Sequence, residues 1–342
     1  MSRILAIDSG LTVTKAVIFD LKGRQIAGAR CNVPQLMPAP RMVERDMDVL
    51  WQETATAIRP VLDQSDTDPG EILAVSATAH GDGIYLLDAE ARPLGPGILS
   101  LDSRATDTVA EWDATDLPAG SLALTGQSPH VSSPSALLAC MRDHEPERYA
   151  RIGHILACKD WLRFCLTGEI GTDLTEASTS FTDVRTQAYS AEALDLFGLS
   201  DLAHALPPAS PSAQVVGALS AAAAAQTGLT AGTPVAAGLH DVTASALGIG
   251  AHQAGCVGVI AGTYSINECV STEPRTDPRW FCRNAVEPGR WNNMAISPAS
   301  TTNYDWFLDT FCAADRAMAE LCCGTIHSAL AGELEDALTR AS

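Results

Sequence analysis

The chain has 342 residues, of which 46% are hydrophobic and 18% are charged, and this globular composition excludes a disordered or collagen-like protein. A chain of this length is expected to form two domains, because domains commonly contain about 100–200 residues. Its 22 basic and 41 acidic residues give a net charge of −19, and the sequence has no cluster of lysine and arginine, so nucleic-acid binding is not expected.

Membrane and export signals are not apparent in the sequence. No stretch approaches the roughly 20 apolar residues of a membrane helix, and the short apolar run at residues 4–7 is ended by Asp8 before it could form a leader. The ten cysteines show neither a framework spacing nor a CxxC pair. We therefore expect a cytoplasmic protein with reduced thiols and no membrane association.

Apolar periodicity and turn residues predict a mixed α/β chain. In chain order the predicted elements are strands 3–8, 14–20 and 25–32, helix 46–62, strands 72–77 and 84–87, helices 103–112, 135–143, 159–166 and 221–225, strand 234–237 and helix 242–247. The proline-rich segment 206–211 is typical of a surface crossing or a subdomain boundary.

One internal repeat bears on the architecture. Residues 256–270 follow the plan of residues 4–19: an apolar strand, a short turn with glycine and threonine, and a second apolar strand. Two matching hairpins far apart in the chain indicate a duplicated fold with two facing lobes. Hairpins of this composition are common, so coincidence is the alternative.

The first hairpin combines a carboxylate with phosphate-type donors. Asp8 ends the buried strand and offers a ligand for Mg²⁺. Backbone and side-chain donors for phosphate oxygens follow at Ser9, Gly10, Thr12, Thr14 and Lys15. The alternative is an ordinary hairpin in which Asp8 and Ser9 satisfy turn amides.

Two further positions are candidates for chemistry. Asp241 opens a helix, where it is expected to act as an N-cap and to stay ionised, and an ionised carboxylate facing a cleft can accept a proton from a hydroxyl. His80 follows a strand and could donate to a sugar hydroxyl, or bond only the backbone of its turn. His240 has no second ligand at helical spacing, so no metal site is predicted there.

Other nucleotide and hydrolase motifs are absent from the sequence. It contains no GxxxxGK[ST] phosphate loop and no GxGxxG after a strand, which disfavours Walker-A enzymes and dinucleotide oxidoreductases. It also has no GxSxG elbow, which disfavours an α/β-hydrolase.

The combined motifs are nevertheless specific. They are AIDSGLTVTKAVIFD at residues 6–20, KDWLRFCLTGEIGTD at 159–173, VGALSAAAAAQTGLTAGTPVAAGLHD at 216–241, GLHDVTASALGIG at 238–250 and CVGVIAGTYSINE at 256–268. In their order and separation they resemble the FGGY carbohydrate kinases of the actin-like ATPase superfamily. Within that family the chain looks most like the L-xylulose kinase and erythritol kinase branch.

This resemblance implies an α/β, actin-like (ribonuclease H-like) two-lobe fold and assigns roles to the candidates. Asp8 would bind Mg²⁺, and the turns at Ser9–Thr12 and at Gly262 and Thr263 would hold the phosphates of ATP. Asp241 would be the catalytic base, and Ala79 and His80 would lie where the family holds its sugar.

The chain is shorter than the family pattern. Only 80 residues follow Gly262, and the glycine-rich adenosine motif of the family is missing. We therefore expect a complete sugar-binding lobe at residues 1–245 and a truncated nucleotide-binding lobe at 246–342. Such a chain would bind ATP weakly and turn over slowly or not at all. Its unfinished lobe would expose apolar surface, with which self-association or a homodimer is compatible.

The expected activity is transfer of the γ-phosphoryl of ATP, with Mg²⁺, to a primary hydroxyl of a small sugar or polyol, such as the ketopentose L-xylulose or a tetritol. A non-catalytic sugar-binding or regulatory protein derived from such a kinase is the first alternative. An actin-like or chaperone-like ATPase without a sugar substrate is the second, and the His80 loop and Asp241 count against it.

Overall fold

The computed structural model describes residues 2–261, 265–297, 300–322 and 324–341. The chain forms two compact units. The larger comprises Met1–Gly258 and Glu268–Ala295, and the smaller comprises Val259–Asn267 and Ile296–Ser342. The mixed α/β architecture predicted from the sequence is confirmed, and within the described residues no helix is long and apolar enough to cross a membrane.

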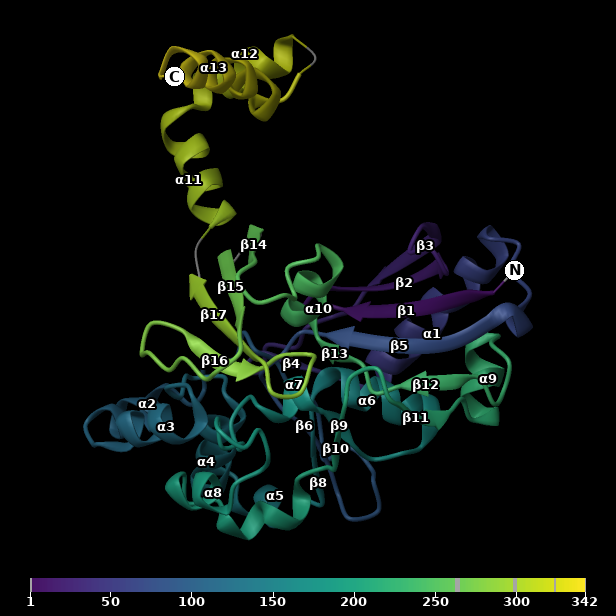
Figure 1. Ribbon diagram of the computed structural model, residues 1–342, viewed down its shortest axis with the longest axis vertical. Helices are drawn as coiled ribbons and strands as arrows, with labels where there is room; N and C mark the ends of the chain where they lie inside the picture. Colours follow the sequence, from purple (N-terminus) through teal and green to yellow (C-terminus); the bar gives the residue numbers. More distant parts are fainter. Residues whose placement is uncertain (1, 262–264, 298–299, 323, 342) are drawn as a thin grey trace. The chain divides into compact units, whose positions relative to one another are not determined.

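A seven-stranded sheet is the frame of the larger unit (Figure 1). Its order is β11-β12-β5-β1-β2-β3, with β13 also paired to β5. Its strands are β1 (Arg3–Ser9), β2 (Val13–Asp20), β3 (Gln25–Asn32), β5 (Ile72–Ala79), β11 (Val215–Ala218), β12 (Pro234–Ala236) and β13 (Leu239–His240). The first three strands form the predicted antiparallel meander, whereas β12 and β13 run parallel to β5, as does β1.

The two-residue period of a strand decides which side chains of β1 reach the core. Leu5, Ile7 and Ser9 are completely buried, while the alternate residues between them are only partly buried. Leu5 and Ile7 share a hydrophobic cluster with residues of α1 (Met47–Gln64) and α6 (Cys158–Thr167). Asp8 therefore points away from this core, and Ser9 points into it.

Helix α1 forms where the sequence predicts it. The side chain of Asp46 caps its start by accepting a hydrogen bond from the Val49 N–H at 2.9 Å. Leu50, Ile58 and Val61 recur on one face and are completely buried in the core cluster. This amphipathic face anchors the helix beside β2 and β3.

A second apolar cluster lies within the same unit. It includes Ile84, Leu137, Phe181 and Leu202, and it is built mainly from short helices. The helices of this region are α2 (Thr106–Asp113), α3 (Leu117–Thr125), α4 (Pro134–His144), α5 (Pro146–Tyr149), α8 (Ala191–Leu196) and η2 (Ser200–Ala205). The sequence predicted helices at α2 and α4 but did not indicate α3 or α8.

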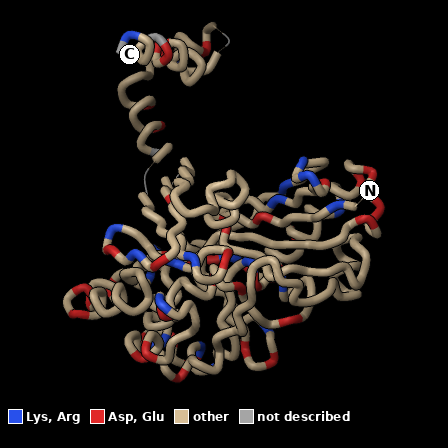
Figure 2. Tube along the Cα trace, viewed as in Figure 1, with Lys and Arg blue, Asp and Glu red and all other residues tan. Residues whose placement is uncertain are grey.

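Short elements complete the larger unit. They are β4 (Glu44–Arg45), η1 (Pro69–Glu71), β6 (Tyr85–Leu87), β7 (Gly97–Ile98), β8 (His154–Leu156), β9 (Thr172–Asp173), α7 (Leu174–Ala177), β10 (Ala209–Ser210), α9 (Ala221–Thr227) and α10 (Asp241–Gly248). Lysine and arginine positions are spread along the chain trace over separate elements (Figure 2). Several of these residues pair with an acidic neighbour.

A second sheet follows in the order β14-β15-β17-β16. Its strands are β14 (Val257–Ala261), β15 (Ser265–Ser271), β16 (Phe281–Asn284) and β17 (Trp291–Ser297). The first two are the strands of the repeated hairpin, and they are neighbours, as the sequence predicts. The turn residues Gly262 and Thr263 lie outside the described residues, and β16 and β17 were not predicted.

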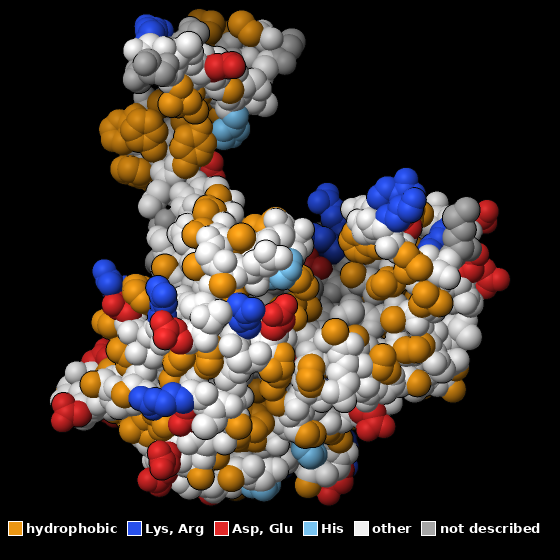
Figure 3. Space-filling view, in the orientation of Figure 1, with side chains coloured by type: hydrophobic (Ala, Val, Ile, Leu, Met, Phe, Trp, Pro, Cys, Tyr) orange, Lys and Arg blue, Asp and Glu red, His pale blue; other side chains and the backbone are white. Residues whose placement is uncertain are grey.

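The smaller unit contains the last three helices, α11 (Thr301–Phe311), α12 (Ala313–Leu321) and α13 (Ile326–Ala341). Leu308 and Ile326 are buried, but large apolar side chains such as Trp306, Phe311 and Leu321 are exposed. Figure 3 shows apolar side chains gathered over α11. The predicted self-association of the chain stays a prediction.

A buried ion-pair network joins α6 to the start of α7. The Lys159 ammonium lies 2.6 Å from Asp160 Oδ1 and 2.9 Å from Asp173 Oδ1, and the three side chains are at most 1% exposed. Burial alone would lower the pKa of Lys159, but Asp160, Asp173 and Glu176 outweigh it and raise this pKa above its ordinary value. The ammonium therefore stays charged inside the protein.

We expect Lys159→Ala to lower the free energy of unfolding by about 3–5 kcal/mol, because it leaves two buried carboxylates without their cation. Urea unfolding followed by circular dichroism measures this change. Lys22→Ala, at an exposed turn, is the control and should change stability by less than about 0.5 kcal/mol. Equal effects of the two variants would contradict a structural role for the network.

Candidate functional site

Three candidate segments from distant parts of the sequence meet at one edge of the main sheet. Ser9 of β1 and His240 of β13 are both paired with Ala79, the last residue of β5. The His80 N–H continues the ladder by donating to the Ser9 carbonyl at 3.0 Å. Because these strands are parallel, Asp8, His80 and Asp241 all lie at their carboxyl ends, where open α/β sheets commonly bind ligands.

A glycine allows β13 to reach this edge. Gly238 joins β12 to β13 with φ +79°, and a Cβ atom there would lie 2.0 Å from the Ala77 carbonyl oxygen. Any other residue would push the chain away from β5. Glycine is therefore required at position 238 by the close approach of the chain to β5, which the sequence alone does not reveal.

Asp8 lies on the open side of β1. Its side chain is 40% exposed, and its Oδ2 lies 3.1 Å from the ammonium of Lys15, its cross-strand neighbour. Mg²⁺ is commonly bound through one or two carboxylates, with waters and substrate phosphates as the other ligands. A single accessible carboxylate fits that pattern. Among the described residues, no group of three or more His, Cys, Asp or Glu could hold a metal by itself.

Several expected phosphate donors of the first hairpin are already engaged. Ser9 and Thr14 are fully buried, and their hydroxyl oxygens lie 2.9 Å apart in a hydrogen bond. The Gly10 N–H donates to the Val13 carbonyl at 2.9 Å. Strand alternation turns both hydroxyls inward, so the expectation that they face a phosphate is not met here. Thr12 and Lys15 remain exposed.

Arg45 holds the same turn from inside the protein. This arginine is completely buried, and its guanidinium donates to the Gly10 carbonyl at 3.2 Å and also to the Leu11 carbonyl. The guanidinium thereby satisfies backbone acceptors of the hairpin that would otherwise be unpaired. No local sequence pattern pointed to this residue, since it lies far along the chain from the turn.

His80 and Ala79 lie inside the protein. Ala79 is completely buried, and the His80 ring is close to the Tyr85 hydroxyl, with 3.3 Å between Nε2 and the phenolic oxygen. Burial, reinforced by Arg45, lowers the pKa of His80 to about 3, so its imidazole is neutral. The structure thus favours the packing interpretation of the His80 ring over a hydroxyl-binding one.

Asp241 is the first helical residue of α10, and His240 occupies the N-cap position. Its Oδ1 accepts a hydrogen bond from the Val242 N–H at 2.7 Å. Burial raises the pKa of Asp241 to about 7, opposed by that N–H and reinforced by Asp8, Asp82 and Glu268. Asp241 is therefore not the N-cap that the sequence predicted, and burial makes its charged form less favourable than its helix position alone would. The 34% of the side chain that stays exposed limits the shift through contact with water.

A buried polar group that the sequence did not indicate lies beside this site. The Arg283 guanidinium of β16 lies 2.8 Å from Asp82 Oδ1 and donates to Gln127 Oε1 at 2.8 Å. Burial alone would raise the pKa of Asp82, but Arg283 and His130 outweigh burial and lower it below its ordinary value. The only local signal was the glycine turn at residues 80–83, in which Asp82 adopts φ 55°.

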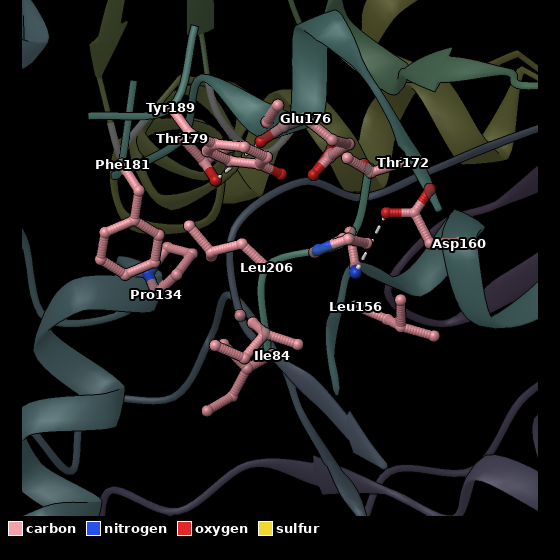
Figure 4. Close-up of a pocket in the computed structure, with 15 residues that line it drawn as sticks. Ile84, Pro134, Leu156, Asp160, Thr172, Glu176, Thr179, Phe181, Tyr189 and Leu206 are labelled. Atoms are coloured by element: carbon pink, nitrogen blue, oxygen red, sulfur yellow. Dashed lines mark hydrogen bonds between the residues drawn. The ribbon is translucent and has the colours of Figure 1, made fainter. Parts of the chain in front are cut away.

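A small cavity lies beside α7 in the same unit. Figure 4 shows Glu176, Tyr189 and Phe181 around it, with Ile84 on the opposite wall. Its volume is about 40 Å³, which suits a few waters rather than a sugar. Glu176 contributes a buried carboxyl whose Oε1 atom has no hydrogen-bond partner.

The chain was compared with known proteins. The family model described as the N-terminal domain of the FGGY family of carbohydrate kinases matches residues 3–248. A probable L-xylulose kinase of Pasteurella multocida is 36% identical over 90% of this chain and 64% of its own length. The L-xylulose/3-keto-L-gulonate kinase of Escherichia coli is 36% identical over 89% and 61%. An erythritol kinase of Brucella abortus is 32% identical over 89% and 60%.

Solved structures agree on the fold. A xylulose kinase from Rhodospirillum rubrum superposes with a TM-score of 0.85 at 27% identity, over 93% of this chain and 66% of that one. A glycerol kinase from Plasmodium falciparum gives a TM-score of 0.81 at 17% identity, over 90% and 63%. The predicted actin-like fold is confirmed. The chain spans less than two thirds of the length of each of these relatives.

The environment of Asp241 makes stability depend on pH. Its folded-state pKa of about 7 exceeds its ordinary value of 3.8, so the folded chain binds this proton more tightly than the unfolded chain does. The associated stability is present below about pH 4 and is lost as the pH rises to about 7. Asp241→Asn does not titrate, so its stability relative to the wild type should increase across this window.

Urea unfolding of both proteins at a series of pH values measures this difference. Asp63→Asn, at an exposed helix position, is the control and should give a nearly constant difference. A constant difference for Asp241→Asn as well would show that the carboxyl keeps its ordinary pKa in the folded protein.

Proposed function

Because the chain belongs to the FGGY family of carbohydrate kinases, we propose that it serves the ATP-dependent phosphorylation of a primary hydroxyl on a small sugar or polyol. The observation that carries the proposal is the meeting of Asp8 and Asp241 at the ends of parallel strands. The proposed acceptor is a ketopentose such as L-xylulose, or a tetritol, in line with the names of the relatives. A cytoplasmic location belongs to the same proposal.

Each lobe has a proposed part in this activity. Residues 1–245 would form the sugar-binding lobe, and residues 246–342 would begin the nucleotide-binding lobe. Gly262 and Thr263 are proposed to contact nucleotide phosphates, although they lie outside the described residues. Thr12 and Lys15 are the exposed donors of the first hairpin that could do so. ATP would supply the transferred phosphoryl group, and Mg²⁺ would neutralise charge on its oxygens.

Asp241 is the proposed general base. A carboxylate with a pKa close to neutral can accept a proton more effectively than one with an ordinary pKa. The Val242 N–H fixes one of its oxygens at 2.7 Å, which leaves the other free to orient a substrate hydroxyl. Asp8, on the open face of β1, is the proposed Mg²⁺ ligand, and Lys15 balances its charge until the metal binds.

Formation of ADP by the purified protein, measured with a panel of pentuloses, tetritols and other polyols, tests the function. We expect slow ADP formation that depends on at least one of these acceptors. If an acceptor raises the thermal stability of the protein but no ADP forms at saturating ATP and Mg²⁺, the chain is a sugar-binding protein and the proposed activity is wrong.

For the best acceptor, Asp241→Asn should lower kcat by about 10²–10⁴-fold, because the amide cannot accept the hydroxyl proton. KM for the acceptor should change less, since Asn can still accept hydrogen bonds. Asp113→Asn, on the exposed surface of α2, is the matched control. A kcat near that of the wild type in Asp241→Asn would refute the assignment of the base.

Asp8→Ala should reduce the effect of Mg²⁺ on ATP affinity while leaving acceptor binding nearly unchanged, because only the metal ligand is removed. Calorimetric titration of ATP with and without Mg²⁺ measures this, with Asp63→Ala as control. If the response to Mg²⁺ is intact in Asp8→Ala, then Asp8 is a residue of the turn and not a metal ligand.

A further inference from the structure

Three polar side chains stand in a row that ends at Asp241. Glu176 Oε1 lies 4.0 Å from His240 Nε2, and His240 Nδ1 lies 3.8 Å from Asp241 Oδ1. Glu176 and His240 are 3% and 7% exposed. Glu176 Oε1 and His240 Nδ1 are both buried without a hydrogen-bond partner. Buried polar atoms without partners are uncommon, because the loss of their hydration is not compensated, so this row needs an explanation.

The short helix α7 places His240 from one side. Asp173 caps this helix by accepting from the N–H groups of Thr175 and Glu176 at 3.0 and 3.3 Å. The Thr175 hydroxyl donates to Asp173 at 2.7 Å and accepts from the His240 N–H at 3.0 Å. Thr175 therefore fixes the backbone of His240, while Glu176, the next residue, faces its ring.

Gly81 encloses the ring from another side. A Cβ atom at Gly81 would lie 1.7 Å from His240 Nε2 and 1.9 Å from its Cδ2. No side chain can occupy this position while the ring stays where it is, so Gly81 forms the wall of a fitted slot. The imidazole lies between α7 and the turn after β5, with Glu176 Oε1 4.0 Å from its Nε2 and Asp241 Oδ1 3.8 Å from its Nδ1.

The protonation states of Glu176 and His240 determine which of their atoms can donate a hydrogen bond. Burial raises the pKa of Glu176 well above its ordinary value, opposed by Lys159 and reinforced by Asp160, Asp173 and Asp82. Burial lowers the pKa of His240 to about 4; Arg283 and Lys159 act in the same direction, against Asp82 and Asp173. A neutral carboxyl can donate through its O–H, and a neutral imidazole has one donor and one acceptor.

We propose that His240 is a positioning residue, which accepts a hydrogen bond from the Glu176 hydroxyl at Nε2 and donates one from Nδ1–H to the Asp241 carboxylate. This assignment satisfies both unpartnered atoms at once, whereas the opposite tautomer would direct a lone pair at the carboxylate. Each contact must shorten by about 1 Å to reach hydrogen-bond length. Such tightening on substrate binding is common at catalytic hydrogen bonds.

The proposal extends the proposed function of Asp241. A hydrogen bond from Nδ1–H would fix the orientation of the carboxylate and favour its charged form, which is the form that accepts a proton. Without it, Asp241 would be protonated over a wider pH range and would point at the acceptor less often. The expected consequence is a lower kcat with a smaller change in KM.

The tautomer of His240 can be measured without any catalysis. Nitrogen-15 NMR of the chain with labelled histidine distinguishes Nδ1–H from Nε2–H, and the signal missing in His240→Gln identifies His240. We expect a neutral ring protonated at Nδ1. An Nε2–H ring or an imidazolium at neutral pH would overturn the proposal. This result holds or fails independently of the proposed kinase activity.

Substitutions at Glu176 then test the function of the row. Glu176→Gln keeps a donor at the same place, whereas Glu176→Leu removes it, so the Gln variant should have a kcat at least about tenfold higher than the Leu variant. The acid limb of the kcat–pH profile should move to higher pH in Glu176→Leu. The exposed Glu169, changed to Gln and to Leu, is the matched control.

Equal activity of the two Glu176 variants would contradict the proposed hydrogen bonds from Glu176 to His240 and from His240 to Asp241. Thermal unfolding shows whether Glu176→Leu is folded; if it is not, the tautomer of the wild type and the pH profile of Glu176→Gln decide. Absence of phosphoryl transfer by the wild type with every acceptor would refute the proposed function and would leave the NMR result to decide this inference.

Discussion

The rest of the site depends on the buried ion pairs that the Lys159 ammonium forms with Asp160 and Asp173. A charge this deep is tolerated only because Asp160 and Asp173 lie within 2.9 Å of it. Asp173 in turn caps α7, and Thr175 of α7 binds the backbone of His240. Through Asp173 and Thr175, the ion pair therefore helps to fix the backbone of His240, the residue next to Asp241. These contacts connect α6 to the edge of the sheet where the candidate site lies.

The sheet contributes a second constraint, the alternation of strand side chains. It turns Ser9 and Thr14 into the core and leaves Asp8 outside. Apolar periodicity and turn residues were enough to predict the strands of the first hairpin, most of the strand to which Ala79 belongs and the helix that Asp241 begins. The residues of the first hairpin were predicted as one set of phosphate donors. Alternation of side chains along the two strands, which can be read from the sequence, would have separated Ser9 and Thr14 from the exposed donors.

Other features of the site depend on contacts between distant residues, which local patterns do not encode. Arg283 and Asp82 pair across most of the chain, and the strand that carries Arg283 was not predicted. Burial and carboxylates from three other segments raise the pKa of Asp241, and a helix-terminus argument alone does not include these effects. Gly81 makes room for the His240 ring because it has no side chain, and no local pattern in the sequence indicates this contact.

The fold gives Asp241 the proton affinity on which its proposed function as a general base depends. Carbon-13 NMR of the chain with labelled aspartate, titrated over pH and compared with Asp241→Asn to identify the signal, measures this directly. We predict a carboxyl that titrates with a midpoint of about 7. A midpoint near the ordinary value of 3.8 would contradict it, since the burial and neighbouring charges described here would then have no effect on the proposed base.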